Sequence, residues 1–131
     1  MNCPDCQTAA VRFRVPERYR TYLSGEAPGA AICPTCLAVT TDEDPPAARP
    51  DFSEIASAFP SDPEAGVPMA IAIGLLTSLA LHRQEIAELF DAVEEAGADP
   101  MLVLDRLANA GSVDSKVDLR GRRRQLEQLL E

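Results

Sequence analysis

The pattern of apolar and polar positions divides the chain into a short β-like part and a longer helical part. In the run Val11–Val15 apolar and basic residues alternate, which puts Val11, Phe13 and Val15 on one face of a predicted strand. Residues 30–32 and 37–40 supply two further short β-like runs. We therefore expect a small antiparallel sheet of two to three strands near the N-terminus.

Residues 51–81 predict two helical segments behind a polar, proline-rich connector at 41–50. The first, residues 51–59, carries Phe52, Ile55 and Phe59 on one side. The second, residues 67–81, is apolar nearly all round and begins either at Asp62-Pro63 or near Pro68. It is shorter than the roughly 20 residues that span a bilayer, so we expect the buried centre of a bundle and no membrane.

The remaining chain predicts three amphipathic helices. The pattern resets at His82, and a stripe of apolar residues at helical spacing runs to Gly97. Asp99-Pro100 is a typical helix start, and the helix it begins is expected to stop at Gly111. The last helix covers about 118–130 and carries a weakening glycine, Gly121, in its first turn. The lone His82 is interpreted as a cap or a solvated side chain rather than a ligand.

These elements predict an α+β protein: a small sheet module followed by an all-α helical bundle. We place the sheet module at residues 1–44, a linker with a short helix at 45–60, and the bundle at 61–131. A stripe of small residues interrupts the apolar helix and would let another helix approach closely, within the chain or from a second copy in a homodimer. The stripe consists of Ala70, Gly74, Thr77 and Ser78.

All four cysteines stand in two copies of one motif, Cys3-Pro4-Asp5-Cys6 and Cys33-Pro34-Thr35-Cys36. Two C-x-x-C pairs at this separation supply four thiolates, which a closed, structural Zn²⁺ site requires. We therefore predict a zinc ribbon with one structural zinc ion on Cys3, Cys6, Cys33 and Cys36. Iron and a redox dithiol remain the alternatives.

Composition and charge indicate the environment. The net charge is −9, and Lys116 is the only lysine beside eleven arginines. Such acidic, lysine-poor chains suit a salt-loaded cytoplasm, since about 1 M salt shortens the screening length to roughly 3 Å; a GC-rich genome is the alternative explanation. No signal peptide is visible, so a cytoplasmic location is expected, where thiols stay reduced and bind metal.

Two classes of function remain after the motifs are considered. The chain has a single histidine, and it lacks the phosphate-loop and dinucleotide motifs. We therefore expect no enzyme, but an adaptor that acts on an unknown protein partner. The alternative is a transcription-associated ribbon that binds nucleic acid, because residues 1–36 hold four arginines against three acids, with two tyrosines nearby. Its candidate residues are Arg12, Arg14, Arg18, Arg20, Tyr19 and Tyr22.

Several motifs together resemble a known kind of protein. They include the opening Met-x-Cys-Pro-x-Cys, Asp51-Phe52-Ser53, Asp62-Pro63-Glu64-Ala65 and Glu95-Ala96-Gly97-Ala98-Asp99-Pro100. The sequence is similar over nearly its full length to an uncharacterised zinc-ribbon family of halophilic archaea. The resemblance implies a salt-adapted, two-part protein and brings no catalytic residue with it. His82 and Pro68 depart from the pattern.

Overall fold

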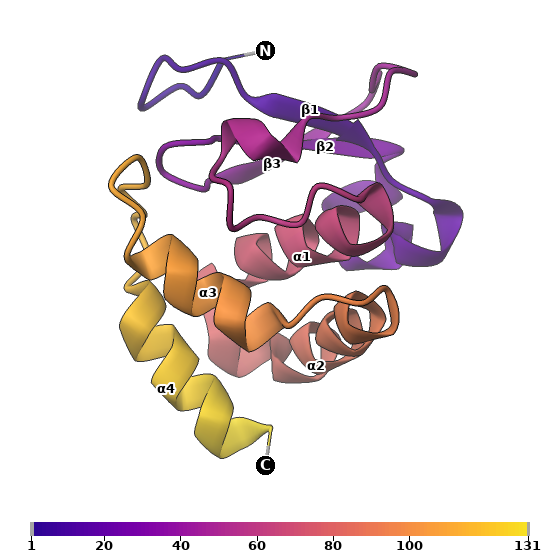
Figure 1. Ribbon diagram of the computed structural model, residues 1–131. Coiled ribbons are helices and arrows are strands. Elements are labelled where there is room, and N and C mark those ends of the chain that lie inside the picture. The colour runs from indigo at the N-terminus through magenta and orange to yellow at the C-terminus, as the bar shows by residue number, and fades with distance from the viewer. Residues whose placement is uncertain (1, 131) are drawn as a thin grey trace.

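The computed structural model describes residues 2–130 and has the predicted α+β architecture, with the sheet at one end and the helices at the other (Figure 1). Strands β1 (Val11–Arg14), β2 (Gly29–Ile32) and β3 (Val39–Asp42) form an antiparallel sheet in that order. The helical elements are the 3₁₀ turns η1 (Glu17–Tyr22), η2 (Ser24–Glu26), η3 (Phe52–Glu54) and η4 (Leu76–Ser78), and the α-helices α1 (Pro63–Leu75), α2 (Leu79–Glu95), α3 (Pro100–Ala108) and α4 (Leu119–Leu129).

One face of the sheet is buried as the alternation in β1 predicts. Phe13 and Val15 have no exposed surface, whereas Arg14 is exposed. Phe52 from η3 packs on Phe13 with ring centroids 5.5 Å apart. Helix α1 meets the same ring at Gly66, where an added Cβ would lie 2.6 Å from the Phe52 ring. A glycine at this position therefore lets α1 approach η3 closely.

Helix α1 is the middle layer of the molecule, between the sheet and α2 (Figure 1). Residues 65–73 are all buried, which explains why this segment is apolar on every side. The structure places its start at Asp62, whose carboxylate accepts the N–H of Glu64 at 3.0 Å, and Pro63 is the first helical residue. Pro68 therefore lies inside the helix rather than at its beginning.

The apolar helix ends earlier than its sequence suggests, at Leu75 rather than near Leu81. The hydroxyl of Thr77 donates to the carbonyl of Gly74 at 3.2 Å, and such a local bond competes with the helical hydrogen bonds. The chain turns at η4, so that α1 and α2 pack side by side (Figure 1). A second irregularity occurs at His82 (φ −120°, ψ 18°), where the sequence pattern resets.

The apolar segment around this turn could be mistaken for a membrane span. Residues 63–95 are long and apolar enough to cross one by length and composition, but 61% of the most apolar 18-residue window is buried inside the protein. Burial of this kind is typical of a core helix in a bundle.

The last three helices follow the predicted stripes and caps. Leu89 and Phe90 of α2 are buried, and Gly97 follows its end with a φ of 97°. Asp99 caps α3 through the N–H groups of Met101 and Leu102, but α3 ends at Ala108, before Gly111. Asp118 caps α4 through the N–H of Gly121 at 3.1 Å.

The sheet and the helices share one hydrophobic core, which runs from Phe13 through Ile71 to Leu104. The connection between them is also packed: Pro45 is buried against Gly29, where an added Cβ would lie 2.4 Å from the proline ring. Phe52, Ile55 and Phe59 are buried, as predicted, although only residues 52–54 form a 3₁₀ turn. The division at residues 44/45 and 60/61 stays a prediction.

Candidate metal centre

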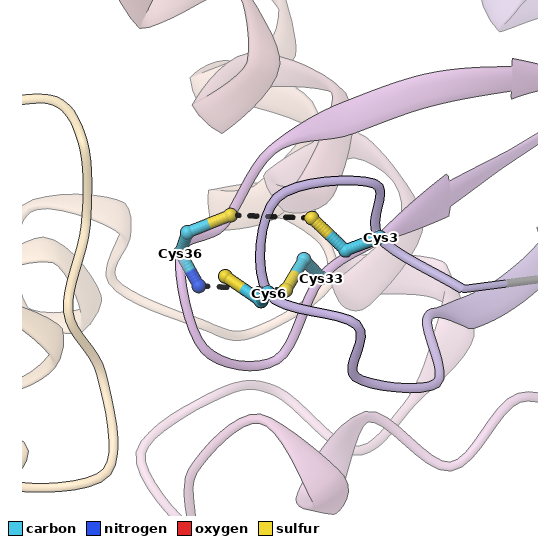
Figure 2. A group of neighbouring side chains, drawn as sticks. All are labelled: Cys3, Cys6, Cys33 and Cys36. Carbon is cyan, nitrogen blue, oxygen red and sulfur yellow. Dashed lines mark hydrogen bonds between the residues drawn. The ribbon is translucent and has the colours of Figure 1, made fainter.

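The structure brings all four cysteines together (Figure 2). Their Sγ atoms lie within 4.8 Å of one another, and those of Cys3 and Cys36 are 3.7 Å apart. Cys3, Cys33 and Cys36 are buried, Cys6 is half-buried, and all four are free thiols. The predicted ligand set is therefore assembled at one point, and it could hold a metal ion.

Two loops with the same backbone carry these cysteines: the first knuckle, residues 3–8, and the second knuckle, residues 33–38. In the first, the N–H of Cys3 donates to the carbonyl of Thr8 at 2.9 Å, and the N–H of Gln7 donates to that of Cys3 at 2.8 Å. The corresponding distances in the second knuckle are 2.9 and 3.0 Å. The repeated motif therefore folds twice into the same structure.

Each knuckle has a residue with positive φ directly after its second cysteine: Gln7 (φ 54°) and Leu37 (φ 64°). This conformation is uncommon for residues other than glycine, and it strains the backbone by about 1 kcal/mol or more. The positive φ bends the chain sharply after the second cysteine, so that both cysteines of a pair point toward the same metal position.

Backbone N–H groups point at the sulfur atoms. The N–H of Cys36 lies 3.5 Å from Cys33 Sγ (Figure 2). Hydrogen bonds from the backbone of Cys6 and Asp5 lower the pKa of Cys3 to about 7. Burial, by contrast, raises the pKa of Cys36 to about 12. A cation between the four sulfurs would favour the thiolate form of all of them.

The donor set fits a tetrahedral ion with sulfur ligands. A Zn–S bond of about 2.3 Å implies sulfur–sulfur edges of about 3.8 Å in a tetrahedron. The separation of 3.7 Å between the sulfurs of Cys3 and Cys36 agrees with such an edge. Thiolates select zinc, iron or copper(I) over the hard cations, which prefer oxygen.

A second set of contacts links the knuckles to the loop between α3 and α4. The N–H of Asp114 donates to the carbonyl of Thr35 in the second knuckle at 2.7 Å. Lys116 forms an ion pair with Asp5 in the first knuckle, and this hydrogen bond raises the pKa of Lys116. Sequence reasoning missed these contacts; the one available signal was that Lys116 is the only lysine.

A protein-family model matches nearly the whole chain. Residues 2–130 match a family described as "Family of unknown function (DUF6276)". The chain belongs to the DUF6276 family. That description assigns no activity to the chain. No curated protein and no solved structure matches this DUF6276 chain.

Two of the arginines proposed to bind nucleic acid, Arg12 and Arg14, link strand β1 to the segment that follows β3. Arg12 Nε donates to the buried carboxylate of Asp42 at 2.7 Å, and its Nη2 donates to the carbonyl of Asp44 at 2.7 Å. Arg14 Nη2 donates to the carbonyl of Pro45 at 3.2 Å. The hydrogen bond from Arg12 also lowers the pKa of Asp42.

The other four candidates contact the protein itself. Arg18 lies over the Tyr19 ring and 3.5 Å from the carboxylate of Glu64 in α1. Tyr22 donates its hydroxyl to Glu88 of α2 at 2.8 Å. Arg20 donates to a carbonyl at the end of β1. All six residues therefore make contacts within the protein, and their use for nucleic acid stays a prediction.

The small residues of the predicted dimer stripe have different surroundings. Ala70 is fully buried, and Gly74 faces Val39 of β3, with 2.9 Å between an added Cβ and the valine Cβ. Thr77 and Ser78 are exposed at the turn η4. Gly74 thus seats α1 on the sheet, Ala70 is part of the core, and a homodimer through the stripe stays a prediction.

Proposed function

We propose that this DUF6276 protein is a non-enzymatic interaction module with one structural zinc ion per chain, bound in a zinc ribbon. The four sulfurs, which lie within 4.8 Å of one another, carry this proposal: Cys3, Cys6, Cys33 and Cys36 would fill all four positions of a tetrahedral ion and leave none open for a substrate. Zinc is favoured over iron because such closed C-x-x-C pairs are typical of structural zinc. The metal would hold the two knuckles together, and function would lie elsewhere on the surface.

The chain's composition supports a salt-adapted cytoplasmic host. Its net charge of −9 would cost self-repulsion in dilute buffer, and molar salt screens that cost. A protein in such a host must bind its partner through contacts that survive high salt, which favours apolar surfaces over exposed ion pairs.

A groove of about 720 Å³ between α2, α3 and α4 offers such a surface. Its exposed apolar lining is Leu129 (41%) and Leu130 (38%), with the buried Phe90 and Leu126 behind them. Carboxylates of Asp91 and Glu94 stand among the lining residues. An apolar floor with an acidic rim is complementary to an amphipathic helix with basic flanks, and we assign the groove to such a helix of a partner protein.

The test is affinity purification from the native host in molar KCl, followed by cross-linking of the captured protein. We expect a partner to be captured by the wild type, with a basic amphipathic helix cross-linked beside α2 and α4. Leu130→Glu should abolish the capture by placing a charge in the groove. Leu81→Glu, at a leucine that is 79% exposed outside the groove lining, is the matched control and should capture normally.

Two results would contradict the assignment: capture that survives Leu130→Glu, or cross-links that lie away from the groove. Metal content is measured on the same samples. A chain without metal that still captures its partner would overturn the zinc part of the proposal and leave the groove standing.

A further inference from the structure

A second groove, also of about 720 Å³, lies on the other side of α4 and has the opposite charge. Lys116, Arg122 and Arg124 line it, together with the hydroxyl of Thr77 and the side-chain amides of Gln125 and Gln128. We call it the basic groove. Lys116 is paired with Asp5, so the positive charge that the groove offers comes from its two arginines, a local reversal of sign in a chain of net charge −9.

The two arginines of this groove have no carboxylate partner among the described residues. Within residues 2–130, neither Arg122 nor Arg124 has a carboxylate within ion-pair distance, whereas Arg12, Arg18 and Arg123 each do. Two cations that lack an anion are thereby held on one helix, two residues apart. The groove contains one carboxylate, Asp118, which accepts the N–H of Gly121 as the cap of α4.

Arg122 supplies the most specific observation. Its Nη1 donates to Gln125 Oε1 at 3.0 Å, which fixes the guanidinium in the groove. Its Nε is buried and has no hydrogen-bond partner among the atoms that the structure describes. A buried donor without an acceptor is costly, and an acceptor in the groove would reach this one only after the Arg122 side chain shifts outward.

We propose that the basic groove binds phosphate groups. A guanidinium presents parallel donors that match two oxygens of a phosphate, and an ordered Arg122 loses little freedom on binding. Arg124 adds a second charge, so the groove suits a ligand with more than one phosphate. The side-chain amide of Gln128 supplies an uncharged donor that high salt does not screen, whereas the Thr77 hydroxyl already donates to the Gly74 carbonyl.

A short polyphosphate and a nucleic-acid backbone both present this chemistry. The assignment differs from the sheet-based alternative, because it uses α4 and not Arg12 or Arg14. It also goes beyond the proposed protein contact. The groove with the acidic rim lies on the opposite side of α4, so either proposal can be refuted without the other.

The experiment titrates the full-length, metal-loaded protein with pyrophosphate and with a fluorescent single-stranded oligonucleotide, in buffer with moderate KCl. The double variant Arg122→Gln, Arg124→Gln should weaken binding about tenfold for each lost charge-assisted contact. Arg49→Gln removes one charge from the connection before η3 and is the control, which should bind like the wild type. Circular dichroism and metal content verify that the variants fold.

The two ligands distinguish a small phosphate compound from a nucleic-acid backbone. Pyrophosphate binding without oligonucleotide binding identifies a small phosphate compound, and oligonucleotide binding that pyrophosphate displaces identifies a backbone. The proposal is overturned if neither ligand binds. It is also overturned if Arg49→Gln weakens binding as much as the double variant, because the attraction would then be non-specific.

Discussion

The two cysteine knuckles share a backbone but have very different surroundings. The second knuckle connects β2 to β3, and its Cys33, Cys36 and Leu37 are all buried at 4% exposure or less. The first knuckle precedes the sheet, its Gln7 is exposed, and its Cys6 is half-buried. The same local structure is thus embedded in the protein at one site and stands at its edge at the other.

This difference shows that local sequence determines the shape of a knuckle, whereas its surroundings determine its stability. The repeated hydrogen bonds arise within each loop and need no tertiary partner. Apolar burial, which is the larger stabilising contribution, reaches the second knuckle far more than the first. We therefore infer that the first knuckle depends on the metal for its order, while the second is also held by the core.

The largest expected effect comes from removing one cysteine ligand from either knuckle. Cys6→Ser and Cys33→Ser should both abolish metal binding, because three thiolates do not complete the site and apparent zinc affinities are worth about 10–16 kcal/mol. Cys6→Ser should keep the fold of the helices. Cys33→Ser should melt at a lower temperature than Cys6→Ser, since it also places a hydroxyl at a position with 1% exposure.

Metal analysis and thermal melts followed by circular dichroism measure both effects. Equal melting temperatures of the two variants would contradict the difference between the knuckles.

The next effect concerns the ion pair between Arg12 of β1 and Asp42 of β3. Asp42→Asn leaves Arg12 without its carboxylate and should lower the free energy of unfolding by about 2 kcal/mol at neutral pH. Arg12 lowers the pKa of Asp42, so the stabilisation is complete above the usual pKa of about 4 and is lost as pH falls through the lowered pKa.

Denaturant unfolding at several pH values tests this, with the exposed Asp44→Asn as control. The wild type and Asp42→Asn should differ at pH 7 and converge in acid. A constant difference at all pH values would show that the charge of Asp42 is not what stabilises the pair.

Glycine at the strained position should have opposite effects in the two knuckles. Gln7→Gly relieves the positive φ of an exposed residue and should stabilise the protein by about 0.5 to 1 kcal/mol. Leu37→Gly relieves the same strain but removes a buried side chain, so it should destabilise by about 1 to 2 kcal/mol. Unfolding curves in denaturant give both values, and equal signs would refute the comparison.

The smallest effect is expected at Lys116, which binds the exposed Asp5 of the first knuckle. Both side chains are more than half exposed, so the pair is worth at most about 1 kcal/mol and is screened by salt. Lys116→Met should speed metal transfer to a chelator by a few fold at low salt and have no effect in molar KCl. The rate is followed with a chromogenic chelator, and a change that persists in molar salt would exclude an electrostatic cause.

Local patterns predicted much of this fold. The alternation in β1, the caps Asp62 and Asp99, and the apolar stripe of α2 are determined by neighbouring residues, so they could be read directly. The same holds for the four cysteines, because two short motifs specify them. The break at η4 was not predicted, since it depends on the bond from Thr77 to Gly74 and on how α1 and α2 pack.

The roles of the arginines could not be predicted for a related reason. A guanidinium takes whichever acceptor the fold brings near, and Asp42 meets Arg12 only once β1 and β3 flank β2. The contact of Lys116 with Asp5 likewise joins residues 111 positions apart. Sequence showed which residues are charged, and tertiary structure decided which charges remain free to bind something else.

The central claim is that a single metal ion joins two knuckles of unequal stability. Native mass spectrometry of protein purified without chelator tests it most directly. We predict one zinc ion per chain, bound by the wild type and absent from both Cys6→Ser and Cys33→Ser. A wild-type chain that carries no metal, or that carries iron in place of zinc, would contradict the claim.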